Sequence, residues 1–353
     1  MVKTDDMFCY NRAMNRRAFI KMSGILGIGL ASTSIIPGTA EAVKFDRKRY
    51  KVSRTRLAMG TSVSMTLIHS SRDKAEEAIG LAFEEIDRLS GLMNRFDNRT
   101  AISQLNMEGL LKDIHPDIIE VVGNALEYYR ITRGAFDISV KPLVDLFKEK
   151  FSWMNRQYPD RKRLKEALDL VGSDKIEIEG GIIRFKKPGM GITLDGIAKG
   201  YIVDKASKSL LSHDIENFLI NAGGDMRAVG SRHDRKPWTI AIQDPRKREK
   251  HRNIIHVTDA AVATSGDYEV YFDREKMFHH IVNPETGLSP VLSTSVSVIA
   301  PTAMEADALS TSVFVMNPEN GTRFIDSLPR CESLVISRGN RKKRSAGWKS
   351  TTI

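Results

Sequence analysis

The sequence predicts an α+β fold with a mixed, largely antiparallel sheet and helices packed against it. Three observations support this prediction. Short alternating segments, typical of strands, are mixed irregularly with helical segments. One pair of strands flanks the tight turn Gly180-Gly181, as in a hairpin. A regular strand–helix alternation with a glycine-rich first turn is missing from the sequence, so we do not expect a dinucleotide-binding Rossmann fold.

The individual elements follow from the spacing of apolar residues. Apolar residues that recur every three or four positions predict helices, and strict alternation predicts strands. The helix predicted over 161–171 is expected to stop at Gly172. We see no internal repeat and no low-complexity segment. The predicted helices span 73–93, 116–132, 161–171, 196–212 and 305–316, and the predicted strands span 62–69, a hairpin within 175–187, 218–221, 238–242, 268–272 and 295–299.

The first 42 residues have the order of a secretion signal. Arg16-Arg17 precedes a modestly apolar run over 22–36, and a small-residue pattern at 40–42 offers a cleavage point. A membrane anchor is the alternative, but the apolar run is shorter than the roughly 20 residues that a bilayer core requires. We therefore predict a twin-arginine signal peptide over 1–42, a catalytic domain over 43–353, and export to the periplasm.

Cysteine content and charge limit the classes of site. Of the 2 cysteines, Cys9 lies in the predicted signal, so Cys331 alone would remain, without an internal disulfide or a cysteine-based metal site. The net charge of +10 is concentrated at 44–56, 246–252 and 338–349. We interpret these runs as solvated loops and termini, with peripheral membrane association as the alternative. None interleaves aromatic with basic residues, so nucleic acid is not an expected partner.

Two glycine-containing segments are unusual for a plain core, and the first of them could approach a phosphate. In 194–201, two glycines and Lys199 lie where a loop enters a helix, and a helix start favours negative charge. An ordinary helix start with a surface lysine explains this segment equally well. In 220–225, a strand ends in paired glycines and Asp225, which is also common in plain turns.

A third segment, 306–311, puts polar groups at the head of an otherwise apolar helix. Asp307 and Thr311 are four residues apart and share a helical face. Magnesium takes oxygen ligands, often a carboxylate together with hydroxyl, carbonyl and phosphate oxygens. Helix capping would explain Asp307, but it does not explain Ser310 and Thr311 within the apolar stretch.

The fourth segment contains the adjacent histidines His279 and His280. One of two neighbouring residues on a strand faces inward, and an inward histidine beside a phosphate can act as acid or base. A structural histidine is the more common case. Ser265, upstream of this segment, could be a hydrolase nucleophile, although it lacks the flanking glycines of a nucleophile elbow.

Taken together and in this order, these segments resemble the FAD:protein FMN transferase family, also called ApbE-like. The resemblance extends from Met59-Gly60-Thr61 nearly to the C-terminus and includes Ser103-Gln104-Leu105-Asn106. It implies a compact α/β unit that attaches FMN from FAD to a Thr or Ser of another protein and releases AMP, with Mg²⁺ as cofactor. Further matching blocks are 134–140, 142–143 and the four segments above.

The resemblance also implies site residues. His280 corresponds to the catalytic histidine, and the magnesium ligands correspond to the side chains of Asp307 and Thr311 with the carbonyls of Gly196 and Ser310. Two departures affect these expectations, since many members carry aspartate where this chain has Thr193 and where it has Asn283. The expected FAD contacts are Met59, Ala135, Phe136, Asp137, Thr193, Lys199 and Ile281.

The expected partner is an exported flavoprotein acceptor belonging to a membrane electron-transfer complex, again by resemblance. Two alternatives remain open at this point. An FAD pyrophosphatase would use water instead of the acceptor hydroxyl and release free FMN and AMP. A flavin-binding maturation factor would have no turnover, and it would not require the metal that Asp307 and Thr311 suggest.

Overall fold

One antiparallel sheet of nine strands organises the molecule. The computed structural model describes residues 41–44, 49–150, 159–232, 235–245, 253–267, 279 and 281–351. All neighbouring strands of the sheet pair antiparallel. The order across it is β1 (Glu41–Lys44), β2 (Tyr50–Ala58), β3 (Thr61–His69), β7 (Phe218–Ala222), β8 (Asp225–Val229), β11 (Ala260–Gly266), β12 (Ser293–Ala300), β13 (Glu332–Ser337) and β14 (Lys342–Arg344).

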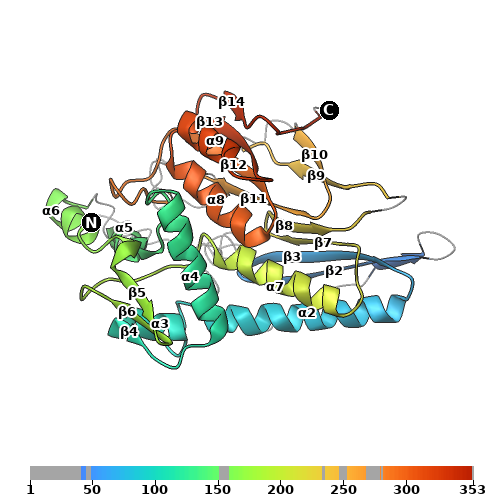
Figure 1. Cartoon of the computed structure of the whole chain (residues 1–353), viewed down its shortest axis with the longest axis horizontal. Coiled ribbons are helices and arrows are strands. Elements are labelled where there is room, and N and C mark those ends of the chain that lie inside the picture. Colours follow the sequence, from blue (N-terminus) through green and yellow to red (C-terminus); the bar gives the residue numbers. More distant parts are fainter. Residues whose placement is uncertain are drawn as a thin grey trace, which may run out of the picture.

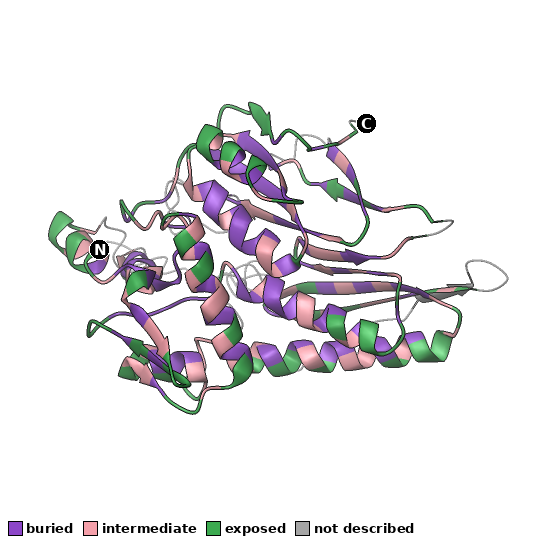
Figure 2. Cartoon of the chain, in the orientation of Figure 1, coloured by how far each residue is buried: buried purple, intermediate pink, exposed green. Residues whose placement is uncertain are grey.

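Three helices cover one face of this sheet. They are α2 (Arg72–Met93), α7 (Ala198–Ser212) and α8 (Ala303–Val315), which cross it side by side (Figure 1). The buried residues of α2 recur at helical spacing and face the sheet, whereas α7 and α8 are buried on most sides (Figure 2). Apolar side chains from these helices and from alternate positions of β3 and β12 form the main core.

A short hairpin packs on the opposite face of the sheet. It consists of β9 (Trp238–Ile242) and β10 (Asn253–Val257), which pair antiparallel. Its inward residues form a second apolar cluster with side chains of β11 and β13. Strand β12 therefore lies between two layers, which explains why nearly all of its eight residues are buried.

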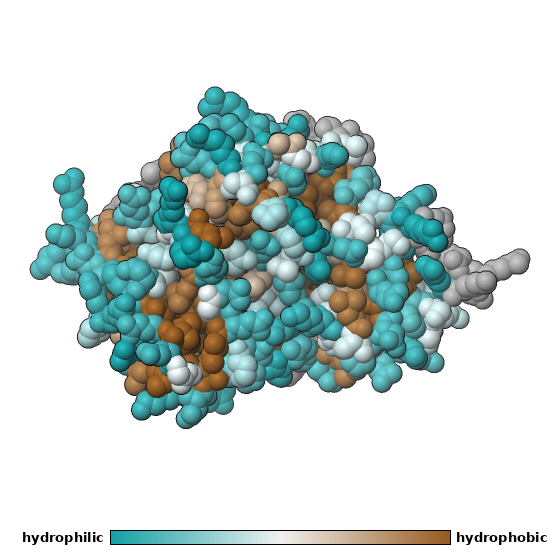
Figure 3. Space-filling view, viewed as in Figure 1, coloured by the Kyte–Doolittle hydropathy of each residue, from teal (hydrophilic) through white to brown (hydrophobic). Residues whose placement is uncertain are grey.

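A smaller unit adjoins one end of the main sheet (Figure 1). Its three-stranded sheet has the order β4 (Leu110–Leu111), β6 (Ile182–Phe185) and β5 (Ile176–Glu179). On the face of the whole molecule that Figure 3 shows, apolar residues form separate patches between polar ones. The helices of the smaller unit are α3 (Ala101–Glu108), α4 (Pro116–Ile131), η1 (Ile138–Val140), α5 (Lys141–Lys150), α6 (Arg161–Leu168) and η2 (Ser173–Lys175). Outside this unit, α9 (Pro318–Asp326) packs against α8 and β13.

The predicted α+β class with its antiparallel sheet is confirmed, and so are the five predicted helices, each within a few residues. The strand predicted at 268–272 lies outside the described residues, as does the predicted signal before residue 41. Strand β1 begins at Glu41, so it includes two residues placed before the predicted domain boundary at 42, and that boundary stays a prediction. Among the helices that the structure describes, none is long and apolar enough to span a bilayer.

A buried carboxylate joins α4 to α7 and α2. Asp117 accepts hydrogen bonds from the hydroxyl of Tyr201 at 2.6 Å and from the guanidinium of Arg88 at 2.9 Å. The ammonium of Lys205 lies 3.1 Å from the same carboxylate. Burial alone would raise the pKa of Asp117, but the bonds from Tyr201, Arg88 and Lys205 outweigh it and lower the pKa to about 2.

Asp117→Asn is therefore expected to reduce the free energy of unfolding at pH 7 by about 2 kcal/mol. Because the folded-state pKa is depressed, this contribution is present above the ordinary pKa of 3.8 and is lost as the pH falls towards 2. Urea unfolding of wild type and variant at pH 7 and pH 3 measures it, and the difference should shrink at pH 3. An equal difference at both pH values would contradict this account. Asp97→Asn, at an exposed surface pair with Arg99, is the control.

Candidate active site

The start of α7 lies directly against α8. The first turn of α7 has no side-chain cap from the residue that precedes it. Instead, the backbone N–H of Gly200 donates to the Asp307 carboxylate at 3.1 Å. Thr302, not Asp307, caps α8 by accepting from the N–H of Glu305, so the alternative that Asp307 caps its own helix is wrong. The carboxyl group of Asp307 thus lies at the positive end of the neighbouring helix.

Asp307 is buried in an environment that disfavours its charge. Only 5% of the residue is exposed. Burial, followed by the nearby Asp225 carboxylate, raises its pKa well above the ordinary value, and Lys199 opposes this only in part. The ammonium of Lys199 lies 2.6 Å from Asp225. Lys199 is therefore paired with Asp225 and only partly offsets the burial of Asp307, so a further cation would favour the ionised form of Asp307.

Hydroxyl groups surround the same point of α8. The Ser265 hydroxyl, at the end of β11, lies 2.8 Å from that of Ser310 and 3.2 Å from that of Thr311. Gly196 closes the other side, because a side-chain carbon added there would lie 3.2 Å from the Thr311 hydroxyl. The four residues predicted as metal ligands, Gly196, Asp307, Ser310 and Thr311, therefore come together in space.

This donor set fits a small hard cation. Within the described ranges, no group of three or more His, Cys, Asp and Glu side chains could hold a metal, so transition-metal coordination by such groups is not seen there. One carboxylate, hydroxyls and nearby backbone are oxygen donors, which Mg²⁺ prefers, and substrate phosphates commonly complete its shell. The buried Asp307 carboxylate, with its raised pKa, is the observation that favours such a cation.

The residues predicted to contact FAD occupy different environments. Phe136 is buried beside Gly196, with its ring 3.4 Å from a side-chain carbon added there. Met59 is at the β2–β3 turn with a left-handed φ of 51°, and Ile281 is in the main core. The β7–β8 turn at Gly223 packs against Thr61, so both turns reach the same end of the sheet. Ala135 precedes Phe136 and is half-buried.

Asp137 and Thr193 have clear structural partners. The Asp137 carboxylate accepts hydrogen bonds from the hydroxyls of Ser139 and Ser173, both at 2.6 Å, and from their backbone N–H groups. It joins η1 to η2, and burial raises its pKa. The backbone N–H of Thr193 donates to the carbonyl of Ile138 at 2.8 Å. These bonds hold the Phe136-containing loop against the segment that leads into α7.

Of the two adjacent histidines, His279 is buried, and His280 lies outside the described residues. The imidazole of His279 is 3.0 Å from the carbonyl of Pro290 and meets the Phe314 ring edge-on at 5.4 Å. Its backbone N–H donates to the Ser289 hydroxyl at 3.0 Å, and that hydroxyl donates to its carbonyl. His279 is thus the structural member of the pair, in a loop tied to α8.

Two residues of this site, Asp225 and Ser265, were not among the predicted site residues. Asp225 was recognised only as the end of a glycine turn, and Ser265 only as a weak candidate nucleophile. Their sequence signal is a polar residue at or next to the end of a strand, because Asp225 begins β8 and Ser265 is the last residue but one of β11. In the structure Asp225 reaches the first turn of α7 and Ser265 reaches the middle of α8.

A known protein family matches this chain over most of its length. The ApbE family profile matches residues 59–335, which is most of the chain. The chain belongs to the ApbE family. All four predicted metal-ligand positions and His280 fall within the matched range of the family.

Individual members of the ApbE family are moderately similar. A curated FAD:protein FMN transferase of Haemophilus influenzae is 28% identical over 299 residues, covering 81% of this chain and 85% of that protein. One of Vibrio cholerae is 32% identical over 247 residues, covering 67% and 74%. These relatives confirm the prediction of a transferase enzyme.

Solved ApbE structures share the fold. The crystal structure of the ApbE protein from Thermotoga maritima aligns with a TM-score of 0.77 and 30% identity, covering 84% of this chain and 97% of that one. The flavin transferase ApbE from Vibrio cholerae aligns with a TM-score of 0.70 and 26% identity, covering 88% and 98%. The resemblance found from sequence motifs is thereby confirmed at the level of family and fold.

Proposed function

We propose that this chain is an exported, Mg²⁺-dependent FAD:protein FMN transferase, which links FMN to a Thr or Ser hydroxyl of an acceptor flavoprotein and releases AMP. The observation that carries the proposal is the convergence of Asp307, Lys199 and the hydroxyls of Ser310 and Thr311 at the start of α7. Helix N-termini favour anions, and the oxygen donors suit a cation, so a diphosphate–metal pair fits both.

The proposed reaction is an in-line displacement at the FMN-side phosphorus of FAD. The acceptor oxygen forms a bond to this phosphorus as the bond to the bridging oxygen breaks, and AMP leaves with the electron pair. Mg²⁺, when bound by Asp307, Thr311 and the carbonyls of Gly196 and Ser310, would neutralise charge on the diphosphate. His280 takes the proton of the attacking hydroxyl. Positioning and charge neutralisation supply most of the acceleration in such transfers.

The residues around the diphosphate have separate tasks in this proposal. Lys199 and the N-terminus of α7 bind phosphate oxygens, while Phe136, Met59 and Ile281 provide apolar surface for FAD. Apolar walls exclude water, which favours attack by the acceptor over hydrolysis. The Arg16-Arg17 signal supports export by the route that carries folded proteins.

The test is incubation of the full chain with FAD, Mg²⁺ and an exported flavoprotein subunit as candidate acceptor. Intact-mass spectrometry should show the acceptor gaining one FMN, with one AMP released per acceptor modified. Chelation of the metal with EDTA should stop both. If FMN appears only in free form, the enzyme is an FAD pyrophosphatase, and the transferase proposal fails.

In the same assay, His280→Ala is expected to slow AMP release about 100-fold, because a positioned general base contributes on the order of 10²–10⁴-fold. Affinity for FAD should be unchanged. His213→Ala, at the exposed C-terminal end of α7, is the matched control. An unchanged rate in His280→Ala would remove this residue from the mechanism.

A further inference from the structure

An almost fully buried arginine contacts the segment that leads into the candidate site. Arg95 follows the end of α2, and only 5% of its side chain is exposed. Its guanidinium reaches the two carboxylate oxygens of Asp195 at 2.8 and 3.4 Å and lies 4.4 Å from the centre of the Phe96 ring. A two-pronged bond of this kind fixes direction as well as distance, which a lysine cannot reproduce.

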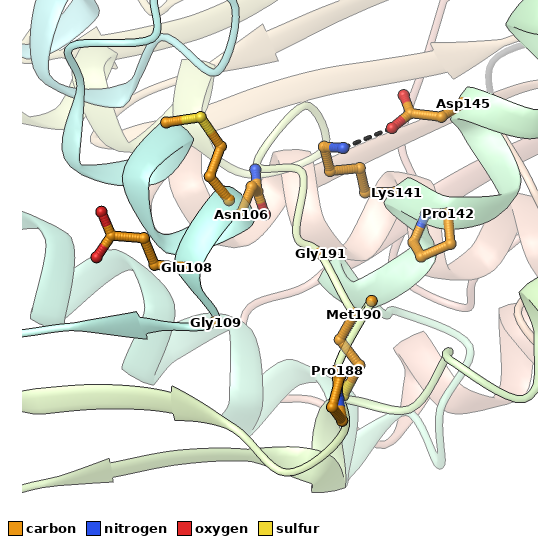
Figure 4. A pocket seen from close by; sticks show the side chains of 11 residues that line it. Asn106, Glu108, Gly109, Lys141, Pro142, Asp145, Pro188, Met190 and Gly191 are labelled. Atoms are coloured by element: carbon orange, nitrogen blue, oxygen red, sulfur yellow. Dashed lines mark hydrogen bonds and ion pairs between the residues drawn. The ribbon is translucent and has the colours of Figure 1, made fainter.

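The segment held by Arg95 has no regular secondary structure of its own. It runs from Pro188 to Ile197, and its Ile192, Leu194 and Ile197 side chains are buried in the main core. Two neutral hydrogen-bonded contacts also hold its backbone. The Asn106 amide bonds both backbone groups of Ile192, at 2.6 and 3.0 Å, and Thr193 donates to Ile138. Figure 4 shows Asn106 and the Lys141–Asp145 ion pair beside the part of this segment that carries Gly191, at a cavity of about 260 Å³. Asp195, the residue that Arg95 holds, directly precedes Gly196 in the sequence.

Asp145 extends the ionic contacts of Arg95 to α5. Its carboxylate lies 4.0 Å from Arg95 and also accepts from Lys141. Lys148 lies 5.0 Å from the Phe96 ring centre, on the same side of the molecule. Arg95 therefore links the end of α2 and the middle of α5 to the residue that directly precedes Gly196. A shift of Asp195 would move the Gly196 backbone relative to Thr311.

We propose that the Arg95–Asp195 pair is a positioning device that sets the Gly196 backbone at the distance from α8 that cation binding requires. This inference rests on the proposed function. Arg95 itself touches neither the hydroxyl cluster nor Asp307 in the contacts described above. Outer partners of this kind usually change metal affinity 10- to 100-fold when they are removed.

The test compares Arg95→Met with Arg99→Met in the full chain. Both are arginines of the connection between α2 and α3, but the side chain of Arg99 is 89% exposed and, within the described part of the chain, bonds its neighbour Asp97. Asp195 retains 37% exposure of its side chain, so loss of its partner leaves a carboxylate that water can reach, and Arg95→Met should fold. Arg95→Lys keeps the positive charge but loses the paired hydrogen bonds of the guanidinium to Asp195.

Mn²⁺ serves as the probe, and its affinity is measured by electron paramagnetic resonance with FAD present. We expect Arg95→Met to weaken Mn²⁺ binding about tenfold or more, Arg95→Lys to lie between it and wild type, and Arg99→Met to match wild type. Wild-type affinity in Arg95→Met would overturn the inference while leaving the proposed function intact.

Hydrogen–deuterium exchange of the ligand-free proteins gives a second readout that is independent of metal. Exchange at residues 193–197 should be at least about tenfold faster in Arg95→Met than in wild type or Arg99→Met, because fewer contacts hold this backbone. If wild type binds no Mn²⁺, the proposed metal site fails, and the exchange data alone decide whether Arg95 positions the segment. Unchanged exchange in Arg95→Met would then overturn the inference.

Discussion

Asp307→Asn is expected to reduce FMN transfer about a thousandfold or more. The replacement removes the only carboxylate of the proposed cation site, and loss of a metal's charge stabilisation costs several kcal/mol in the transition state. AMP release under saturating FAD and Mg²⁺ measures the effect. Raising the Mg²⁺ concentration should recover little of the rate.

The same variant is expected to be more stable than wild type when metal and FAD are absent. Burial raises the pKa of Asp307, so its ionised form opposes folding, and this cost grows as the pH rises above the ordinary value of 3.8. Thermal unfolding at pH 8 in EDTA should therefore show a higher Tm for Asp307→Asn. Asp326→Asn, at an exposed position of α9, should change neither activity nor Tm much. A lower Tm together with normal activity would contradict both parts of this account.

Gly200→Ala is expected to lower the free energy of unfolding by about 3 kcal/mol, because overpacking of a rigid contact costs about 1–3 kcal/mol and occasionally more. A methyl group at this position would lie 2.3 Å from the carbonyl oxygen of Ala303 and 2.6 Å from Met304 Cα. Backbone atoms cannot rotate away, so α7 and α8 must separate. Urea unfolding measures the loss.

Gly91→Ala is the matched control for Gly200→Ala. Gly91 is also helical, but no atom lies within 4 Å of an added methyl group there. Alanine at an exposed helical position is expected to stabilise by up to about 1 kcal/mol. If Gly200→Ala cost no more than 1 kcal/mol, the close contact of the two helices would not be essential. Separation of the helices should also weaken the bond from Gly200 to Asp307 and lower activity.

The fold was predictable where one side of an element is buried. Helix α2 was predicted almost to the residue, because its eight buried side chains recur at helical spacing. Strand β2 was missed because most of its nine residues are at least partly exposed and three of them are basic, so the alternation of apolar and polar residues is faint. Helix α3 was missed as well, because its eight residues are too few for apolar positions to repeat clearly at helical spacing. Its start is marked instead by the Thr100 cap.

The candidate site was predictable only in pieces. Lys199 and Asp307 could each be recognised from local chemistry, and the family resemblance placed them in one site. The ion pair of Lys199 with Asp225 and the contact of Ser265 with Ser310 could not be predicted, because they depend on how distant strands order themselves in the sheet. Arg95 looks like an ordinary surface arginine in the sequence, and only its burial reveals its contact with Asp195.

The strand order of the main sheet has a consequence for how the protein acquires activity. The pairing of β3 with β7 joins residues that are far apart in the chain, and the smaller unit is inserted between them. Such non-local pairing makes folding slow, because the chain loses the conformational entropy of a long loop before the contacts that offset this loss can form. The residues proposed to bind the diphosphate and the metal come from α7, α8 and the segment before α7, and Asp225, which pairs with Lys199, comes from β8, so they meet only after this closure. FAD would therefore bind the folded protein and not the unfolded chain. Binding of this kind raises the free energy of unfolding in proportion to the logarithm of the FAD concentration.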